Sequence, residues 1–317
     1  MSSPQANRLR SPDIVSSFMS PLPLSVSIIT RNEAANLPRC LASIAGLATE
    51  IVVMDSGSTD ATREIAAGYQ ARWIHQDWLG FRDQKQAALE QCGQPWVLAL
   101  DADEEVSAEM RQEIVDFFRE PASTHDGASF PRKVWFLGRW ITHGDWYPDR
   151  KLRLVRRAEA RWGGSPEHDK LEVPGRVLRC RGDLHHFSFP DMARYVEKIN
   201  IFADEYLKRQ LADGRRWSLG ATIFRPCWRF FRAYFLRRGF QDGFAGLWIA
   251  ASTAYQTFVR HSRLYEHQHQ RVPPSDEGGG TLPGKLEMDG KPPAGKEILS
   301  GDSAGRDGGP ASGGGGS

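Results

Sequence analysis

The 317-residue sequence has few cysteines and no long apolar run. Its four cysteines lie far apart without a Cys-x-x-Cys pair, so it does not predict a zinc or dithiol redox site. We expect reduced, mostly packed thiols. No apolar run approaches the roughly 18 residues of a membrane span, and residues 1–20 lack the apolar core of a signal peptide. The simplest expectation is a cytoplasmic protein.

The sequence also has little net charge, +2 at pH 7 from 41 basic and 39 acidic residues. A dedicated nucleic-acid-binding protein usually carries a strongly basic surface. We therefore expect no nucleic-acid partner. Hydrophobic residues make up 40% of the chain, which is enough to bury one sizeable core or two smaller ones.

From Leu24 onward, short β-rich runs alternate with helical patterns. The predicted strands are residues 24–30, 50–54, 72–75 and 96–100, with helices between and after them. This alternation predicts an α/β fold with a Rossmann-like, mostly parallel sheet. The expected divisions are a flexible N-terminus (1–23), a catalytic domain (24–190), a helical extension (191–265) and a disordered Gly/Pro-rich tail (266–317).

Polar and acidic residues follow three of the predicted strands. They are Thr30-Arg-Asn-Glu33, Asp55-Ser-Gly-Ser-Thr-Asp60 and Asp101-Ala-Asp103. Ligands of open α/β sheets bind at the carboxyl ends of the strands. The first of these loops lacks the Gly-x-Gly-x-x-Gly pattern that cradles pyrophosphate through backbone amides. A hard divalent cation shared by carboxylates and phosphates would neutralise a diphosphate instead.

Two other interpretations of the Asp101-Ala-Asp103 motif are open. The acidic residues can form a solvated turn that caps the next helix. An apolar strand that ends in Asp-x-Asp also begins the aspartate-nucleophile phosphotransferases. Those enzymes usually have Gly-Thr or a similar pair after the second Asp, whereas Glu104-Glu105 stands here.

The ordered combination of three segments resembles family-2 inverting glycosyltransferases of the GT-A fold. These segments are Ser27-Ile-Ile-Thr-Arg-Asn-Glu33, Ile51-Val-Val-Met-Asp-Ser-Gly-Ser-Thr-Asp60 and Trp96-Val-Leu-Ala-Leu-Asp-Ala-Asp-Glu-Glu105. The resemblance covers about residues 24–265. It is closest to the bacterial branch that adds β-linked glucose to the lipopolysaccharide inner core.

The resemblance implies a UDP-sugar donor, UDP-glucose above all, and a Mg²⁺ or Mn²⁺ cofactor. It implies that Thr30, Asn32 and Glu33 bind the nucleotide, with Thr30 and Glu33 beside the uracil and ribose. Asp55, followed by the Ser56-Gly57 turn, would contact the uracil edge. Asp101 and Asp103 would hold the metal and the diphosphate. The acceptor would be a glycan or a lipid-linked molecule such as lipopolysaccharide core.

The segment before the acidic strand departs from this branch. It reads Phe81-Arg-Asp-Gln-Lys-Gln86, with Arg82 and Gln86 where the branch usually has Gly and Asn. Lys85 is retained and would lie against phosphate or on a solvated helix face.

Inverting transfer needs a base to accept the proton of the acceptor hydroxyl. The segments His143-Gly-Asp-Trp-Tyr-Pro-Asp-Arg150 and Gly163-Gly-Ser-Pro-Glu-His-Asp-Lys170 supply carboxylates for this role. Asp169 stands where the resembled branch has a Glu after His, so we predict it as the base, with Asp145, Asp149 and Glu167 as alternatives. Each of these carboxylates could instead cap a turn or form a surface ion pair.

Two histidines, His168 and His186, are candidates to complete the shell of the metal, although a lone histidine often only packs. The basic residues Arg150, Lys151, Arg153, Arg156 and Arg157 could bind phosphorylated acceptors or form a solvated face.

The segment from Phe224 to Arg238 mixes six aromatic side chains, Trp228 among them, with five arginines. It predicts a helix that either contacts an anionic surface of the inner membrane peripherally or packs on the catalytic domain. A non-enzymatic alternative for the whole chain is an inactive module that binds a sugar nucleotide or a glycan.

Overall fold

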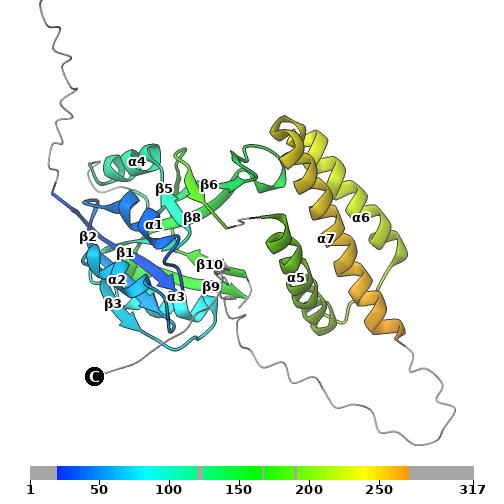
Figure 1. Ribbon diagram of the computed structural model, residues 1–317, viewed down its shortest axis with the longest axis horizontal. Coiled ribbons are helices and arrows are strands. Elements are labelled where there is room, and N and C mark those ends of the chain that lie inside the picture. The colour runs from blue at the N-terminus through cyan, green and yellow to red at the C-terminus, as the bar shows by residue number, and fades with distance from the viewer. Residues whose placement is uncertain (1–19, 120–123, 166–167, 189–190, 271–317) are drawn as a thin grey trace, which may run out of the picture. The chain divides into compact units, whose positions relative to one another are not determined.

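The N-terminal half of the chain alternates strands with helices, as predicted. The structure, a computed structural model, describes residues 20–119, 124–165, 168–188 and 191–270 (Figure 1). The first elements are β1 (Leu22–Thr30), α1 (Leu37–Ile44), β2 (Ala48–Asp55), α2 (Thr62–Gly68), β3 (Arg72–His75), α3 (Phe81–Glu90) and β4 (Trp96–Asp101). The four strands run parallel in the order β3-β2-β1-β4. The predicted strands 24–30, 50–54, 72–75 and 96–100 are confirmed.

The register of this parallel sheet brings the polar strand ends together. Thr30 at the end of β1 pairs with Asp55 at the end of β2, and Ile29 pairs with Asp101 at the end of β4. Fully buried residues such as Val26 and Ile28 anchor β1 in the main core. Burial fixes the register, because a shift by one residue would turn these side chains to the other face.

The second half extends the sheet with antiparallel and parallel neighbours. Its elements are β5 (Glu104–Val106), α4 (Ala108–Arg119), β6 (Gly127–Phe136), β7 (Arg139–Trp140), η1 (Gly144–Trp146), β8 (Asp149–Arg156), η2 (Arg157–Glu159), β9 (Arg161–Ser165), β10 (His168–Glu172), β11 (Val177–Arg179) and β12 (Leu184–His186). Past β4 the order continues β8-β6-β12-β5.

The hairpin of β9 and β10 forms a separate two-stranded sheet. Its cross-strand pair Trp162 and Leu171 packs into a second core with Val97 and Val155. Side chains two residues apart on a strand share a face. Asp169 therefore lies on the same face of β10 as the buried Leu171.

Helices dominate after residue 191, and the predicted helical extension is confirmed. They are α5 (Met192–Ala212), α6 (Leu219–Phe231), the π-helix η3 (Arg232–Leu236), the short 3₁₀ helix η4 (Gly239–Asp242) and α7 (Gly243–His269). Phe136 and Ile141 of the sheet region pack with Ala245 and Ile249 of α7. Within the described ranges, no helix is both long and apolar enough to cross a membrane. The expected divisions at residues 23, 190 and 265 stay predictions, and residues 1–19 and 271–317 lie outside the described residues.

Candidate active site

Asp55 organises the loop that follows β2. Its carboxylate is buried, and Oδ2 accepts hydrogen bonds from the backbone amides of Gly57 and Ser58, each 2.8 Å long. Oδ1 accepts from the hydroxyl of Thr30 at 3.2 Å and from the hydroxyl of Ser58. Thr30 and Asp55, both predicted as nucleotide-binding residues, are therefore side by side and fixed in place.

The loop after β1 is tied to the loop after β2. Asn32 has a left-handed backbone, with φ of 55°, a conformation in which Asn is several-fold enriched. The side-chain oxygen of Asn32 accepts a hydrogen bond from the backbone amide of Thr59 at 2.8 Å. The backbone amide of Asn32 donates to Ser58 Oγ at 2.8 Å. The amide of Glu33 donates to Thr62 Oγ1 at 2.9 Å. These bonds fix the loops after β1 and β2 against each other at the carboxyl ends of the strands, and this pair of loops is called the rim below.

Glu33 faces the acidic motif of β4. Burial raises the pKa of its carboxyl, a hydrogen bond from Asn36 lowers it, and the negative charges of Asp103, Asp60 and Asp101 raise it further. These negative charges act together because the strand ends meet. A bound cation would relieve this repulsion.

Two cations hold the carboxylate of Asp101. Lys85 Nζ lies 2.8 Å from Oδ1, and an Arg153 guanidinium nitrogen lies 2.9 Å from Oδ2. Burial alone would raise the pKa of Asp101, but the charges of Lys85 and Arg153 outweigh it and hold that pKa well below its usual range. Asp101 is thus ionised at neutral pH and has an ion pair on each oxygen.

Arg153 does not lie on the solvated face that one interpretation of the basic stretch predicted. Its side chain is only 4% exposed, and it pairs with the fully buried Glu104 at 2.5 Å as well as with Asp101. Burial would lower the pKa of the guanidinium, but Glu104 and Asp101 raise it above its ordinary value. Glu104 also accepts from the backbone amide of Asp101 at 3.0 Å. Arg153 therefore fixes the acidic turn through its buried ion pairs with Asp101 and Glu104.

Replacing Arg153 by methionine should destabilise the protein by about 3–5 kcal/mol, because it removes the closer of the two cations that pair with the buried Glu104 and leaves only Arg132, at 3.7 Å. Urea unfolding of the two proteins measures the change. Arg161→Met is the matched control, since Arg161 is 77% exposed in its pair with Glu172 and should cost less than about 1 kcal/mol. Equal stability of Arg153→Met and Arg161→Met would contradict this account of the turn.

Lys85 connects the acidic turn to the β9–β10 hairpin. Its Nζ lies 2.7 Å from Asp169 Oδ2 and 4.8 Å from the ring centre of Trp162. Burial lowers the pKa of Lys85, but the charges of Asp101 and Asp169 reverse this and raise it above its ordinary value, against the opposing charge of Arg153. Lys85 was expected either against phosphate or on a solvated helix face. In the structure its ammonium is nearly buried and joins Asp101 to the predicted base, Asp169.

The other predicted bases have different surroundings. Asp149 accepts two hydrogen bonds from Arg132, at 2.7 and 3.1 Å, and pairs with Lys151 at 3.2 Å. Burial raises the pKa of Asp149, yet the charges of Arg132 and Lys151 outweigh it and lower that pKa. Asp145 pairs with arginines of the helical extension instead of with residues of the strand ends. Glu167 lies outside the described residues.

Asp103 faces His186, one of the two predicted metal-binding histidines. Asp103 Oδ2 lies 3.4 Å from His186 Nε2, and the histidine side chain is 10% exposed. Adjacent ligands about 2.1 Å from an octahedral ion lie about 3 Å apart, so this pair fits one edge of a metal shell. The described residues contain no group of three or more His, Cys, Asp or Glu that could hold a metal. Phosphate oxygens and water would have to complete the shell. The side chain of His168 lies outside the described residues.

Lys198 on α5 is a neighbour of the site that the sequence did not indicate. Burial lowers the pKa of its ammonium, while the negative charges of Asp103 and Glu33 oppose that shift. The helical extension therefore brings a positive charge to the acidic strand ends. The sequence pattern of α5 gives no signal for this role, because Lys198 stands among ordinary charged positions of an amphipathic helix.

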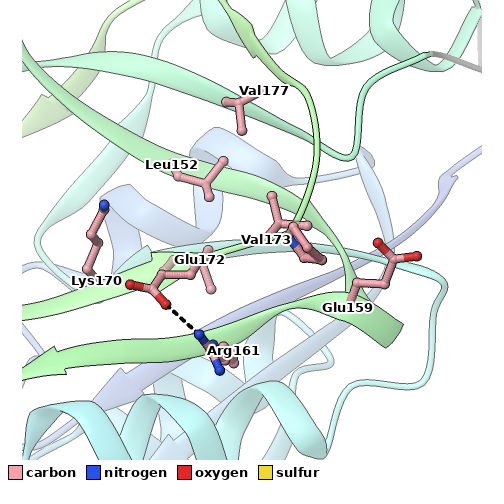
Figure 2. Close-up of a pocket in the computed structure, with 9 residues that line it drawn as sticks. Leu152, Glu159, Arg161, Lys170, Glu172, Val173 and Val177 are labelled. Atoms are coloured by element: carbon pink, nitrogen blue, oxygen red, sulfur yellow. Dashed lines mark ion pairs between the residues drawn. The ribbon is translucent and has the colours of Figure 1, made fainter.

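A cavity of about 660 Å³ lies elsewhere, beside the β9–β10 hairpin (Figure 2). Arg161 and Glu172 pair at its wall at 3.3 Å, and Leu152, Val173 and Val177 give it an apolar lining. None of the acidic strand-end residues lines it. The cavity is therefore not the nucleotide site that the strand ends predict.

The sheet order and the acidic strand ends define a GT-A glycosyltransferase fold. Residues 25–170 match the family model described as glycosyl transferase family 2. The chain is 33% identical over 261 residues to the lipopolysaccharide core biosynthesis glycosyltransferase LpsC of Rhizobium meliloti, across 80% of this chain and 96% of that protein. It is 31% identical over 259 residues to an uncharacterized glycosyltransferase of Rickettsia felis, across 77% and 89%.

The chain therefore belongs to glycosyl transferase family 2, and it is a glycosyltransferase. Among solved structures, Staphylococcus aureus TarS 1–349 in complex with UDP-GlcNAc is 15% identical, with a TM-score of 0.40 over 74% of this chain and 91% of that one. The family rests on the sequence relatives and not on this weak structural likeness. The phosphotransferase interpretation of the Asp-x-Asp motif is excluded.

Proposed function

We propose that this glycosyltransferase transfers a hexose with inversion from a nucleoside-diphosphate sugar, UDP-glucose, to a glycan or lipid-linked acceptor such as lipopolysaccharide core. The name of the rhizobial relative supports the acceptor class. The observation that carries the proposal is the sheet register, which places Thr30, Asp55 and Asp101 at one edge with Asp103 directly beyond. That edge is where ligands of parallel sheets bind.

In this proposal the nucleotide lies across the loops after β1 and β2. Thr30, Asn32, Glu33 and Asp55 border the uracil and ribose, and the hydrogen bonds between the two loops hold that rim before the donor arrives. Preorganisation of this kind lowers the entropy lost on binding. Lys198 would approach the diphosphate from α5, since its charge already acts on Asp103 and Glu33.

Asp103 and His186 would hold Mg²⁺ or Mn²⁺. When bound, the ion neutralises charge on the departing nucleoside diphosphate. Asp101 would not bind the ion, because Lys85 and Arg153 pair with its two oxygens. These ion pairs fix the turn that carries Asp103. This division of roles refines the prediction in which both aspartates hold the ion.

Asp169 is the base in this proposal. It would accept the proton of the acceptor hydroxyl as that oxygen bonds to the anomeric carbon, while the bond from that carbon to the diphosphate oxygen breaks. Two observations support Asp169 over Asp145 and Asp149. It is linked through Lys85 to the acidic turn, and its strand is anchored by Trp162 and Leu171.

The donor class is tested by thermal unfolding of the protein with UDP-, GDP- and dTDP-sugars in the presence of Mg²⁺. Ligands that bind only the native state raise the unfolding temperature. A UDP-sugar, and UDP-glucose most of all, should raise it more than the GDP and dTDP compounds. An equal rise in unfolding temperature with all three nucleotides would contradict the assignment of the loops after β1 and β2 as the uracil site.

A peripheral membrane contact is part of the proposal, because a lipid-linked acceptor lies at a membrane. On α6 and η3, four aromatic side chains that are 45–67% exposed form a continuous ridge: Phe224, Trp228, Phe231 and Phe235. Consecutive ring centres lie 6.5, 6.0 and 5.4 Å apart. Exposed arginines on the same helix suit an anionic surface.

Changing Phe224, Trp228 and Phe231 together to serine should lower binding to phosphatidylglycerol vesicles by at least about 100-fold, because burial of one such side chain contributes roughly 1.5–3 kcal/mol. Flotation of the protein with the vesicles measures this. A variant with Leu79 and Val177 changed to serine is the control, since both are exposed outside the helical extension. Binding that is unchanged in the triple variant, or absent in the wild-type protein, would refute the contact.

A further inference from the structure

Asp145 receives ion pairs from three arginines. Its side chain is 3% exposed, and it lies 2.9 Å from Arg229, 2.9 Å from Arg232 and 3.3 Å from Arg237. The arginine cluster, defined here as these three residues around Asp145, joins η1 of the catalytic region to α6 and the segment after it. One carboxylate faces three guanidinium groups, so the cluster has two positive charges in excess.

Hydrogen-bond donors in this region also exceed the acceptors. One terminal nitrogen of Arg232 donates to both oxygens of Asp145, at 2.9 and 3.0 Å. The Nε atoms of Arg232 and Arg260 are buried and have no hydrogen-bond partner within the described part of the chain. A buried donor without an acceptor costs free energy comparable to a lost hydrogen bond.

Arg260 of α7 adds to the positive charge. Burial lowers the pKa of its guanidinium, and the charges of Arg229 and Arg209 lower it further. The guanidinium carbon of Arg260 lies 5.9 Å from the ring centre of Tyr206, a contact that leaves its charge unneutralised. An ion pair that only joined the helical extension to Asp145 would need one arginine. The additional cations can bind an anion from solution.

The cluster is open to a ligand from solvent. The side chains of Arg229, Arg232 and Arg237 are 44%, 34% and 46% exposed, although Asp145 beneath them is buried. Guanidinium groups bind phosphate through paired, charge-assisted hydrogen bonds. The single carboxylate of Asp145 can orient the three guanidinium groups, but it neutralises only one of their three charges.

We propose that the arginine cluster binds a phosphate group. The site is separate from the acidic strand ends and does not depend on the proposed sugar transfer. A phosphorylated glycan acceptor and a phospholipid headgroup both present this chemistry. Unfolding temperatures with glucose 6-phosphate and with short-chain phosphatidylglycerol distinguish these two sources.

Inorganic phosphate should raise the unfolding temperature of the full chain relative to chloride at equal ionic strength. Arg229→Gln and Arg237→Gln should each weaken the phosphate affinity at least tenfold, while Arg161→Gln, which changes an exposed pair, should not. Without phosphate, Arg237→Gln should be about as stable as the wild-type protein, because Arg229 and Arg232 still pair with Asp145. This last result separates a ligand site from a purely structural arginine.

Glucose 6-phosphate and short-chain phosphatidylglycerol are then compared. A stronger response to one of them identifies its class as the source, and equal responses mean that the phosphate group alone is recognised. The proposal is overturned if wild-type protein does not respond to phosphate, or if both glutamine variants respond as it does. Because phosphate could also enter the diphosphate site, only the response lost in Arg229→Gln and Arg237→Gln is assigned to the cluster.

Discussion

Replacing Asp103 by alanine should abolish metal-dependent UDP binding and lower sugar transfer by about 10³-fold. A metal ion contributes several kcal/mol of charge stabilisation in a transition state, and about 1.4 kcal/mol corresponds to a tenfold change in rate. In the structure, Asp103 faces His186, whereas Lys85 and Arg153 pair with both oxygens of Asp101. Calorimetric titration with UDP, with and without Mn²⁺, measures the effect.

The fold should survive this change. Asp103 is 25% exposed, and its backbone carbonyl, which accepts from the amide of Phe187 at 3.0 Å, is unaffected by the substitution. Asp116→Ala is the matched control, because Asp116 is an exposed aspartate on α4 that pairs with Arg119. If Asp103→Ala bound UDP with undiminished Mn²⁺-dependent affinity, the ion would not bind at this turn.

Replacing Asp169 by asparagine should lower kcat about 10²- to 10⁴-fold, the usual contribution of a general base. Asparagine keeps the size of the side chain and an oxygen that can accept from Lys85, so the hairpin should keep its place. The KM for the donor should change little, because the base acts on the acceptor hydroxyl. Steady-state rates of the two proteins over a range of donor and acceptor concentrations measure kcat and KM.

Asp149→Asn and Asp145→Asn test the competing bases in the same assay. Asp149 already accepts from Arg132 and pairs with Lys151, so its removal should cost less than Asp169→Asn. Asp145 lies among arginines of the helical extension, and its removal should affect stability more than kcat. A full loss of kcat in Asp149→Asn with activity kept in Asp169→Asn would transfer the role to Asp149.

Local pattern was enough to predict the parallel sheet and its functional edge. The runs around Val26, Val53 and Leu98 are buried and β-rich, and the polar residues that follow each strand mark its end. The register that joins Thr30 to Asp55 follows from burial of these runs. The rim could therefore be predicted from sequence, although the hydrogen bonds of Asn32 and Asp55 within it could not.

Residues that act through distant partners could not be predicted in this way. Arg153 stands in a basic stretch typical of a solvated face, and only its contact with Glu104, 49 positions earlier, explains its burial. Asp145 stands in a segment rich in His, Trp and Asp that resembles an active-site loop. Its partner Arg232 is 87 positions away, and helix packing alone brings the two together.

The same limit applies to Lys85 and Lys198. The sequence left Lys85 between a phosphate contact and a solvated helix face, and the structure places its ammonium between Asp101 and Asp169. The negative charges of Asp103 and Glu33 act on Lys198, although α5 lies far from both residues in the sequence. Amphipathic patterning determines that α5 is a helix but does not specify which charged position faces the site.

The most direct test of the central claim is incubation of the full chain with radiolabelled UDP-glucose, Mg²⁺ and deacylated lipopolysaccharide core. A metal-dependent glycosyltransferase gives labelled product and free UDP, and both disappear when EDTA removes the metal. A module that only binds sugar nucleotides gives no labelled product and no metal-dependent hydrolysis of the donor, and that result would contradict the account.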